Sequence, residues 1–219
     1  MKKSIRRKRI KNELKLGNFR VTIFGSARMK PGDKEYKEVY ELAKMIGERG
    51  IDVVNGGGPG IMEASSSGHK AGSKENAAHS IGLNIKLPHE QRMNPYVDIK
   101  VEFKRFSERL DNFMMLSNVI VVAHGGIGTM LELFFAWQLM QAKHRCNIPI
   151  VLLGEQWSGL VKWLKQEPLR RGFFNKEDLE LLFIAKNPEE AIIIIDKAHE
   201  AFKQGVNNFC LEYKEFKIH

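Results

Sequence analysis

The side chain best placed for chemistry in this sequence is Glu132, which follows a glycine-rich turn. Residues 119–123 predict a short buried strand, and the apolar run from Met130 predicts a helix. The turn between them, residues 124–129, reads HGGIGT. Such a junction directs backbone N–H groups and the positive end of a helix dipole to one place, which favours phosphate. Glu132 could act on a ligand bound there, or Thr129-x-x-Glu132 could be a capping box that only closes the helix start.

A second junction of the same kind occurs earlier in the chain. Residues 51–55 predict a strand, residues 56–60 read GGGPG, and a helix follows from Ile61. The predicted first strand, residues 19–24, also ends in Gly25 and Ser26. Because ligands of open parallel sheets bind at the carboxyl ends of the strands, these turns together could hold the phosphate and sugar of a nucleotide.

The glycine motifs resemble those of one family. Residues 125–132, GGIGTMLE, resemble the PGGxGTxxE signature of the LOG (LONELY GUY) family, whose members were long labelled lysine decarboxylases. Phe24-Gly25-Ser26 and residues 56–63 resemble its other blocks, and the likeness spans about residues 18–200. Characterised members are nucleoside 5′-monophosphate phosphoribohydrolases. Two positions depart from the family: His124 replaces a Pro, and Leu110 replaces the Lys of an Arg-Lys pair whose Arg is Arg109.

The resemblance implies a catalytic role for Glu132 and a charged partner in Arg109. Without it, an ion pair of Arg109 with Asp111 or Glu108 on a solvated helix face explains that arginine equally well. Glu90 lies in a polar loop after the strand predicted at residues 80–87 and could bind a ribose hydroxyl, or it could be a solvated loop acid. The candidate nucleotide- and phosphate-binding residues are Gly25, Ser26, Gly57, Gly58, Gly60, Met62, Glu90, Gly125, Gly126, Gly128 and Thr129.

Strands and helices alternate along the chain, which predicts a three-layer α/β/α Rossmann-like fold with a mainly parallel sheet. We expect one nucleotide-binding domain at residues 18–205, a C-terminal tail at residues 206–219, and a basic, poorly ordered extension at residues 1–17. The predicted strands cover residues 19–24, 51–55, 80–87, 99–103, 119–123, 148–153 and 181–185.

Composition narrows the classes of function. The chain of 219 residues is 43% hydrophobic and 28% charged, as expected for a globular domain. Much of the net charge of +9 comes from residues 1–15, which lack interleaved aromatic residues, so no nucleic-acid partner is expected. No apolar run is long enough to span a membrane. Cys146 and Cys210 lack metal-site or redox spacing, so we expect a cytoplasmic protein. The seven histidines show no His-x-x-x-His pairing with a nearby carboxylate, so we expect no bound metal, and the activity that the resemblance implies requires no cofactor.

The helix predicted at residues 130–140 is apolar almost all round. A helix of this kind must be covered on more than one side. We therefore expect a homodimer that buries Phe134, Phe135 or Trp137, which agrees with LOG-like proteins being dimers.

Four functions compete for this pattern. The leading prediction is hydrolysis of the N-glycosidic bond of a nucleoside 5′-monophosphate to free base and ribose 5-phosphate. The alternative is a non-catalytic nucleotide-binding sensor or cofactor carrier, which the departures at Leu110 and His124 favour. A decarboxylase would need a lysine for pyridoxal phosphate, and none stands beside either junction. A dinucleotide dehydrogenase would need G-x-G-x-x-G after the first strand, which is absent.

Overall fold

The computed structural model describes residues 3–73, 78–86, 93–142 and 148–205. The strands are β1 (Arg20–Phe24), β2 (Asp52–Asn55), β3 (Ser80–Ile85), β4 (Ile99–Phe103), β5 (Val119–Val122), β6 (Ile150–Leu153) and β7 (Leu182–Ala185). The helices are α1 (Lys3–Leu16), α2 (Lys34–Glu48), α3 (Ile61–Gly72), α4 (Phe106–Leu116), α5 (Ile127–Gln141), α6 (Gln156–Leu164), the π-helical turn η1 (Lys165–Leu169), α7 (Lys176–Leu179) and α8 (Pro188–Lys203).

All seven strands form one parallel sheet in the order β4-β3-β2-β1-β5-β6-β7. The predicted Rossmann-like α/β fold is therefore confirmed. β1 pairs on one side with β2 and on the other with β5, so the order of connection reverses between β1 and β5. In open α/β sheets this reversal opens a crevice at the carboxyl ends of the two strands.

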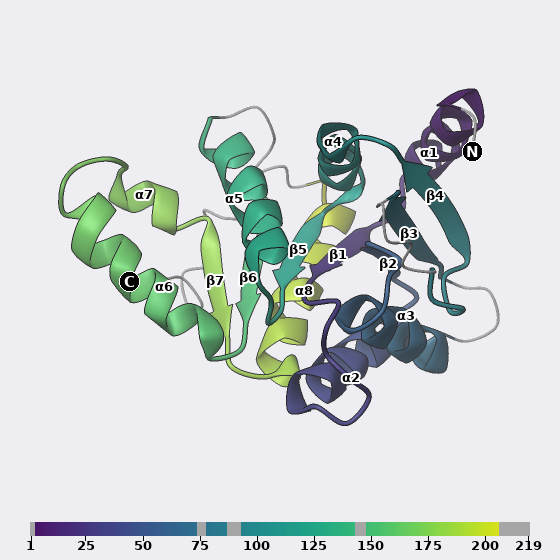
Figure 1. Ribbon diagram of the computed structural model, residues 1–219, viewed down its shortest axis with the longest axis horizontal. Coiled ribbons are helices and arrows are strands. Elements are labelled where there is room, and N and C mark those ends of the chain that lie inside the picture. Colours follow the sequence, from purple (N-terminus) through teal and green to yellow (C-terminus); the bar gives the residue numbers. More distant parts are fainter. Residues whose placement is uncertain (1–2, 74–77, 87–92, 143–147, 206–219) are drawn as a thin grey trace.

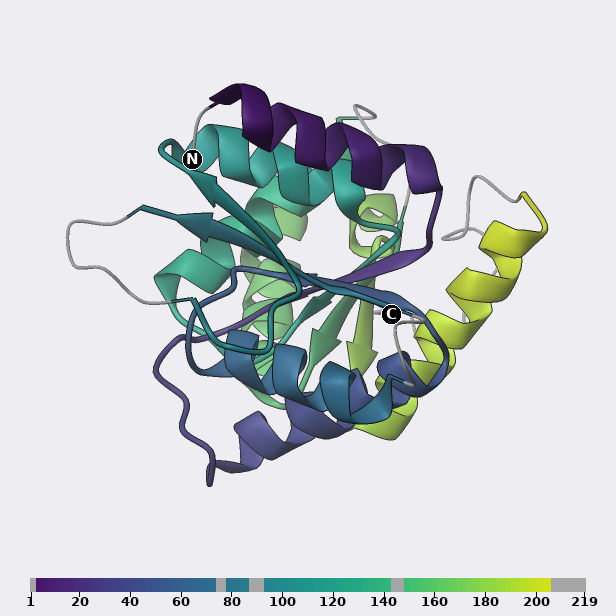
Figure 2. The same ribbon diagram turned by 90° about the vertical axis from the view of Figure 1, so that its right-hand side faces the viewer.

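Helices cover both faces of the sheet (Figures 1 and 2). α2, α3 and α8 pack together on one face, whereas α1, α4 and α5 lie on the other. The strands are buried throughout β1, β2, β5 and β6, as expected for a sheet covered on both sides. The core is one cluster of aliphatic and aromatic side chains between these layers.

The N-terminal segment differs from the poorly ordered extension predicted from its charge. Residues 3–16 form α1, which lies beside α4 and β4. Only two of its side chains with described exposure are buried, Ile10 at 5% and Glu13 at 8% exposure. A helix with so little apolar surface is held by its tertiary contacts, and an apolar pattern could not have predicted it.

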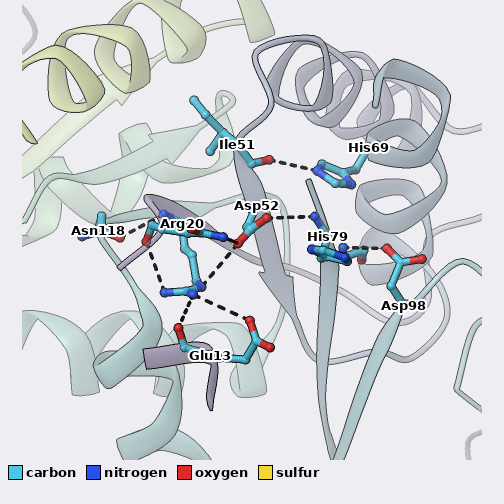
Figure 3. Close-up of polar contacts among 10 residues, drawn as sticks. Glu13, Arg20, Ile51, Asp52, His69, His79, Asp98 and Asn118 are labelled. Carbon is cyan, nitrogen blue, oxygen red and sulfur yellow. Dashed lines mark hydrogen bonds and ion pairs between the residues drawn. The ribbon is translucent and has the colours of Figure 1, made fainter. Parts of the chain in front are cut away.

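Glu13 belongs to a buried polar cluster at the amino ends of the strands (Figure 3). Arg20 donates to the backbone oxygens of Glu13 at 2.6 Å and Asn18 at 3.2 Å, and lies 3.6 Å from the Asp52 carboxylate. Asp52 also accepts from the backbone N–H of His79 at 2.8 Å. This cluster fastens α1 to the edge of the sheet opposite the glycine turns.

Replacing Arg20 should destabilise the protein strongly. Arg20→Met leaves the buried Asp52 carboxylate without its cation, and breaking a buried pair in this way costs about 3–5 kcal/mol. Urea unfolding of the variant and the wild type measures the difference in free energy of unfolding. Arg49→Met is the matched control because its ion pair with Asp196 is partly exposed, so its loss should cost less than about 1 kcal/mol. Equal losses for the two variants would contradict the prediction.

Candidate functional site

A cavity of about 660 Å³ opens at the carboxyl edge of the sheet, at the reversal between β1 and β5. This volume is typical of a small-molecule site. Its walls come from the ends of β1 and β3, the turn after β2, and the first turns of α4 and α5. The lining residues are Ile23, Phe24, Gly25, Ser26, Ala27, Arg28, Gly56, Gly58, Met62, Asn84, Ile85, Phe106, Arg109, Gly126, Ile127, Gly128, Thr129 and Glu132.

The N-terminus of α5 offers free hydrogen-bond donors to this cavity. Gly126 is the N-cap, and the first intrahelical bond runs from Met130 N–H to the Gly126 oxygen at 2.9 Å. Among the hydrogen bonds of the described residues, none uses the N–H groups of Ile127, Gly128 or Thr129. These donors and the helix dipole make the start of α5 suited to an anion.

The capping-box interpretation of Thr129-x-x-Glu132 is wrong. It requires Thr129 to be the N-cap, but α5 begins two residues earlier, at Ile127. Thr129 is 4% exposed and packs against Gly125, where a Cβ would overlap its side chain. Glu132 therefore has no capping role to explain its position.

Glu132 forms a buried ion pair with Arg109 on the cavity wall. The Arg109 guanidinium donates to Glu132 Oε1 at 3.2 Å, and the two residues are 8% and 9% exposed. Burial raises the pKa of Glu132 to about 7, although the positive charge of Arg109 opposes that rise. Burial likewise lowers the pKa of Arg109. A carboxyl group that titrates near neutral pH beside a cavity is suited to proton transfer.

Three further contacts hold Arg109 in place. Its Nε donates to the backbone oxygen of Leu83 at 2.7 Å, and its guanidinium lies 4.8 Å from the centre of the Phe113 ring. A Cβ at Gly56 would come within 2.5 Å of the guanidinium, so the glycine there makes room for it. The alternative of a solvated pair with Asp111 or Glu108 is therefore wrong.

The turn after β2 lines the cavity through Gly56 and Gly58, but its hydrogen bonds join it to other parts of the backbone. Gly60 has a φ of +68°. The N–H of Ile61, at the start of α3, donates to the backbone oxygen of Ser26 at 2.9 Å. Buried Asn94 fastens the same turn by donating from its side chain to the Gly58 oxygen at 2.9 Å. The first backbone N–H of α3 is thus already hydrogen-bonded, whereas the first N–H groups of α5 are free. Of the two junctions, the start of α5 is therefore better suited to an anion.

Most of the predicted site residues meet in this cavity. Those that line it are Gly25, Ser26, Gly58, Met62, Arg109, Gly126, Gly128, Thr129 and Glu132. Gly57, Gly60 and Gly125 do not line it. Glu90 lies outside the described residues. Asn84, Ile85 and Phe106 also line the cavity, and they could not be predicted because neither periodicity nor a motif distinguishes them.

Gln156 is a further residue that the sequence did not reveal. Its side-chain amide forms two hydrogen bonds with Gly125, accepting from the N–H at 3.0 Å and donating to the oxygen at 2.6 Å. Next to this clamp, the His124 oxygen accepts from Ser26 N–H at 2.9 Å. The glycine turn before α5 is thereby tied to α6 on one side and to the end of β1 on the other.

Removing this clamp should weaken ligand binding more than folding. Gln156→Ala frees the turn before α5, so we expect the dissociation constant for a phosphate-bearing ligand to rise about fivefold to tenfold, the effect of one or two net hydrogen bonds. Calorimetric titration with ribose 5-phosphate measures this effect. Gln166→Ala, at an exposed position of η1 that does not line the cavity, is the control, and its affinity should equal that of the wild type. Unchanged binding in Gln156→Ala would show that the turn holds its shape without the clamp.

The described residues include neither a metal-binding cluster nor a membrane-spanning helix. No group of three or more His, Cys, Asp or Glu side chains suited to a metal ion occurs among them. None of the helices they form is both long enough and apolar enough to cross a membrane. Cys146 and Cys210 lie outside the described residues, so a cytoplasmic location stays a prediction.

The sheet order and the glycine turns define a Rossmann-like α/β protein with a cavity at the carboxyl edge of its sheet. The model of the family described as "Possible lysine decarboxylase" matches residues 62–195. The chain therefore belongs to this family, the LOG family, as its motifs indicate.

Similar proteins have different functions. The pyrimidine/purine nucleotide 5′-monophosphate nucleosidase of Escherichia coli K12 is 25% identical over 132 residues, which are 58% of this chain but 29% of that protein. The molybdenum cofactor binding protein of Rippkaea orientalis is 21% identical with a TM-score of 0.63, and 82% of this chain covers 96% of it. The molybdenum cofactor carrier protein of Chlamydomonas reinhardtii is 23% identical with a TM-score of 0.60, with coverage of 84% and 99%. These two structures show a shared fold.

Proposed function

We propose that the protein hydrolyses the N-glycosidic bond of a nucleoside 5′-monophosphate, releasing the free base and ribose 5-phosphate. The observation that carries this proposal is the buried Glu132 carboxyl, which lies on the cavity wall one turn beyond the free N–H groups of α5. Membership of the LOG family and the likeness to a nucleotide nucleosidase support it. In the proposed pose the 5′-phosphate binds at the start of α5 and the anomeric carbon lies beside Glu132.

The chemistry follows from this pose. As the bond between the anomeric carbon and the base breaks, its electron pair leaves with the base, and positive charge develops on the sugar. An ionised Glu132 stabilises that charge and accepts a proton from the attacking water, whose oxygen bonds to the anomeric carbon. The departing base takes up a proton from solvent. Arg109 keeps Glu132 oriented and favours its ionised form, while the bound phosphate fixes the position of the sugar.

A panel of nucleoside monophosphates and the matching nucleosides tests the proposal through the release of free base. Because the phosphate supplies several charge-assisted hydrogen bonds, kcat/KM for a monophosphate should exceed that for its nucleoside by on the order of a hundredfold or more. Equal activity on adenosine and AMP would contradict the phosphate site at α5. Binding of monophosphates without any release of base would contradict the hydrolase.

That last outcome would favour the second candidate, a non-catalytic nucleotide sensor or cofactor carrier. Its support is the shared fold with the two molybdenum cofactor proteins. The two departures from the LOG signature give it little further support. Leu110 is 5% exposed, the His124 imidazole packs against Gly154, and neither residue lines the cavity.

We further propose that the enzyme is a homodimer, in which the exposed apolar side of α5 forms the interface. Met130, Leu131 and Phe134 are 37%, 48% and 37% exposed on this helix. Trp137 is not available to a partner subunit. It is 8% exposed, and its indole N–H donates to the backbone oxygen of Asp178 in α7 at 2.7 Å. Sedimentation at micromolar concentration tests the dimer, and a stable monomer would contradict it.

A further inference from the structure

One wall of the cavity carries an aromatic ring, that of Phe106, and a side-chain amide, that of Asn84. Neither group belongs to the proposed phosphate site or to the ion pair of Arg109 and Glu132. Phe106, the first residue of α4, lines the cavity and is 50% exposed. Asn84 and Ile85 at the carboxyl end of β3 also line it. An exposed aromatic face beside a polar amide is suited to a flat heterocycle, which stacks on the ring and hydrogen-bonds through its edge.

Contacts of Arg109 place this wall relative to the rest of the site. Arg109 lies three residues after Phe106, so the two share one face of α4. Its Nε bonds to the oxygen of Leu83, the residue before Asn84, and its other end bonds to Glu132. The ion pair thus bridges the wall formed by Phe106 and Asn84 to α5, which carries the anion site. A nucleotide with its phosphate at α5 and its anomeric carbon at Glu132 would direct its base to Phe106 and Asn84.

The hydrogen bonds of Asn84 determine what it offers to a ligand. Its Oδ1 accepts from the N–H of Ile85 at 2.8 Å, which fixes the orientation of the amide because a backbone N–H requires an acceptor. No hydrogen bond among the described residues uses the Asn84 NH₂ group, which is therefore free to donate. A base edge facing Asn84 should present an acceptor such as a ring carbonyl. An exocyclic amino group at the same place would meet another donor.

We propose that Phe106 and Asn84 form the subsite for the base and select 6-oxopurine monophosphates over AMP. This inference rests on the proposed function for the placement of phosphate and sugar. Phe106 contributes affinity for any flat base by stacking. Asn84 contributes selectivity through the NH₂ group that it donates to the carbonyl oxygen.

Calorimetric binding of IMP, AMP and ribose 5-phosphate tests both roles. Leaving a polar group unpaired costs about 1–3 kcal/mol, so the wild type should bind IMP about fivefold to 150-fold more tightly than AMP. Asn84→Asp replaces the donor by an acceptor and should abolish or invert this ratio. Phe106→Ala should weaken both nucleotides about tenfold or more, while the affinity for ribose 5-phosphate, which has no base, stays unchanged. Phe173→Ala, on an exposed ring that does not line the cavity, is the control for removing an aromatic side chain.

Two results would overturn the proposal. Equal affinities for IMP and AMP in the wild type would remove the selectivity of Asn84. An equal loss of ribose 5-phosphate binding in Phe106→Ala would show that Phe106 shapes the site rather than stacking on the base. Because binding is measured separately from turnover, selective IMP binding without release of base would support this subsite while contradicting the hydrolase.

Discussion

Glu132→Gln should reduce kcat for the release of base from a nucleoside monophosphate by on the order of a hundredfold or more, with nucleotide affinity largely retained. The substitution keeps the size of the side chain and its ability to hydrogen-bond. It removes the negative charge that the proposed transition state requires and that the ground state uses little. Base release and calorimetric affinity, measured on the same preparation, separate the two effects.

The pH dependence gives a second readout for the same side chain. With a pKa of about 7, Glu132 is largely protonated in mildly acidic buffer, so kcat/KM should rise as the pH increases through about 7. Stability should change in the opposite direction. The pKa in the folded protein lies above the ordinary value of 4.5, so the contribution of Glu132 to stability is complete below about pH 4.5 and is lost as the pH rises through about 7. Glu132→Gln should remove both dependences.

Glu63→Gln is the matched control, because Glu63 lies in the first turn of α3, at the other glycine junction, and does not line the cavity. Its activity and pH profile should equal those of the wild type. Full activity in Glu132→Gln would contradict the proposed mechanism, because no other carboxylate lines the cavity among the described residues.

The fold could be predicted from the sequence because its signals are local. Each predicted strand is present within two residues of its expected ends. Short runs of β-branched and other apolar residues are typical of buried parallel strands, so the strands can be recognised from the local sequence. The two glycine turns could be located from the sequence for the same reason, because each joins the end of a strand to the start of a helix.

The parts that could not be predicted depend on contacts between distant residues. α1 has few apolar residues, and its helix is held by Glu13 and Arg20. Gln156 reaches Gly125 across 31 positions in the sequence. Asn84 and Phe106 come from separate elements and share a wall only because β3 and α4 are neighbours in the fold. A residue whose role depends on such a pairing has no local pattern by which to recognise it.

Arg109→Met should lower kcat/KM at pH 7 by about a hundredfold, partly by changing the ionisation of Glu132. An opposite charge in hydrogen-bond contact typically lowers a carboxyl pKa by about 1–3 units, so its removal should raise the pKa of Glu132 above about 7 by a similar amount. The ionised fraction at pH 7 then falls by about fivefold for a rise of one unit and by about 500-fold for a rise of three units. The remaining loss in kcat/KM comes from the missing positive charge near the bound phosphate and from the lost hydrogen bond to the backbone oxygen of Leu83.

The pH profile distinguishes this cause from general damage to the site. If Arg109 acts through Glu132, the rise of kcat/KM in Arg109→Met should move to higher pH, and activity should partly recover in alkaline buffer. Glu132→Gln should not recover at any pH, since it has no carboxyl group to ionise. Arg105→Met removes an exposed arginine one turn earlier, outside the cavity, and should leave the profile unchanged. A profile in Arg109→Met with the wild-type midpoint and only a lower plateau would show that Arg109 serves substrate binding alone and does not control the ionisation of Glu132.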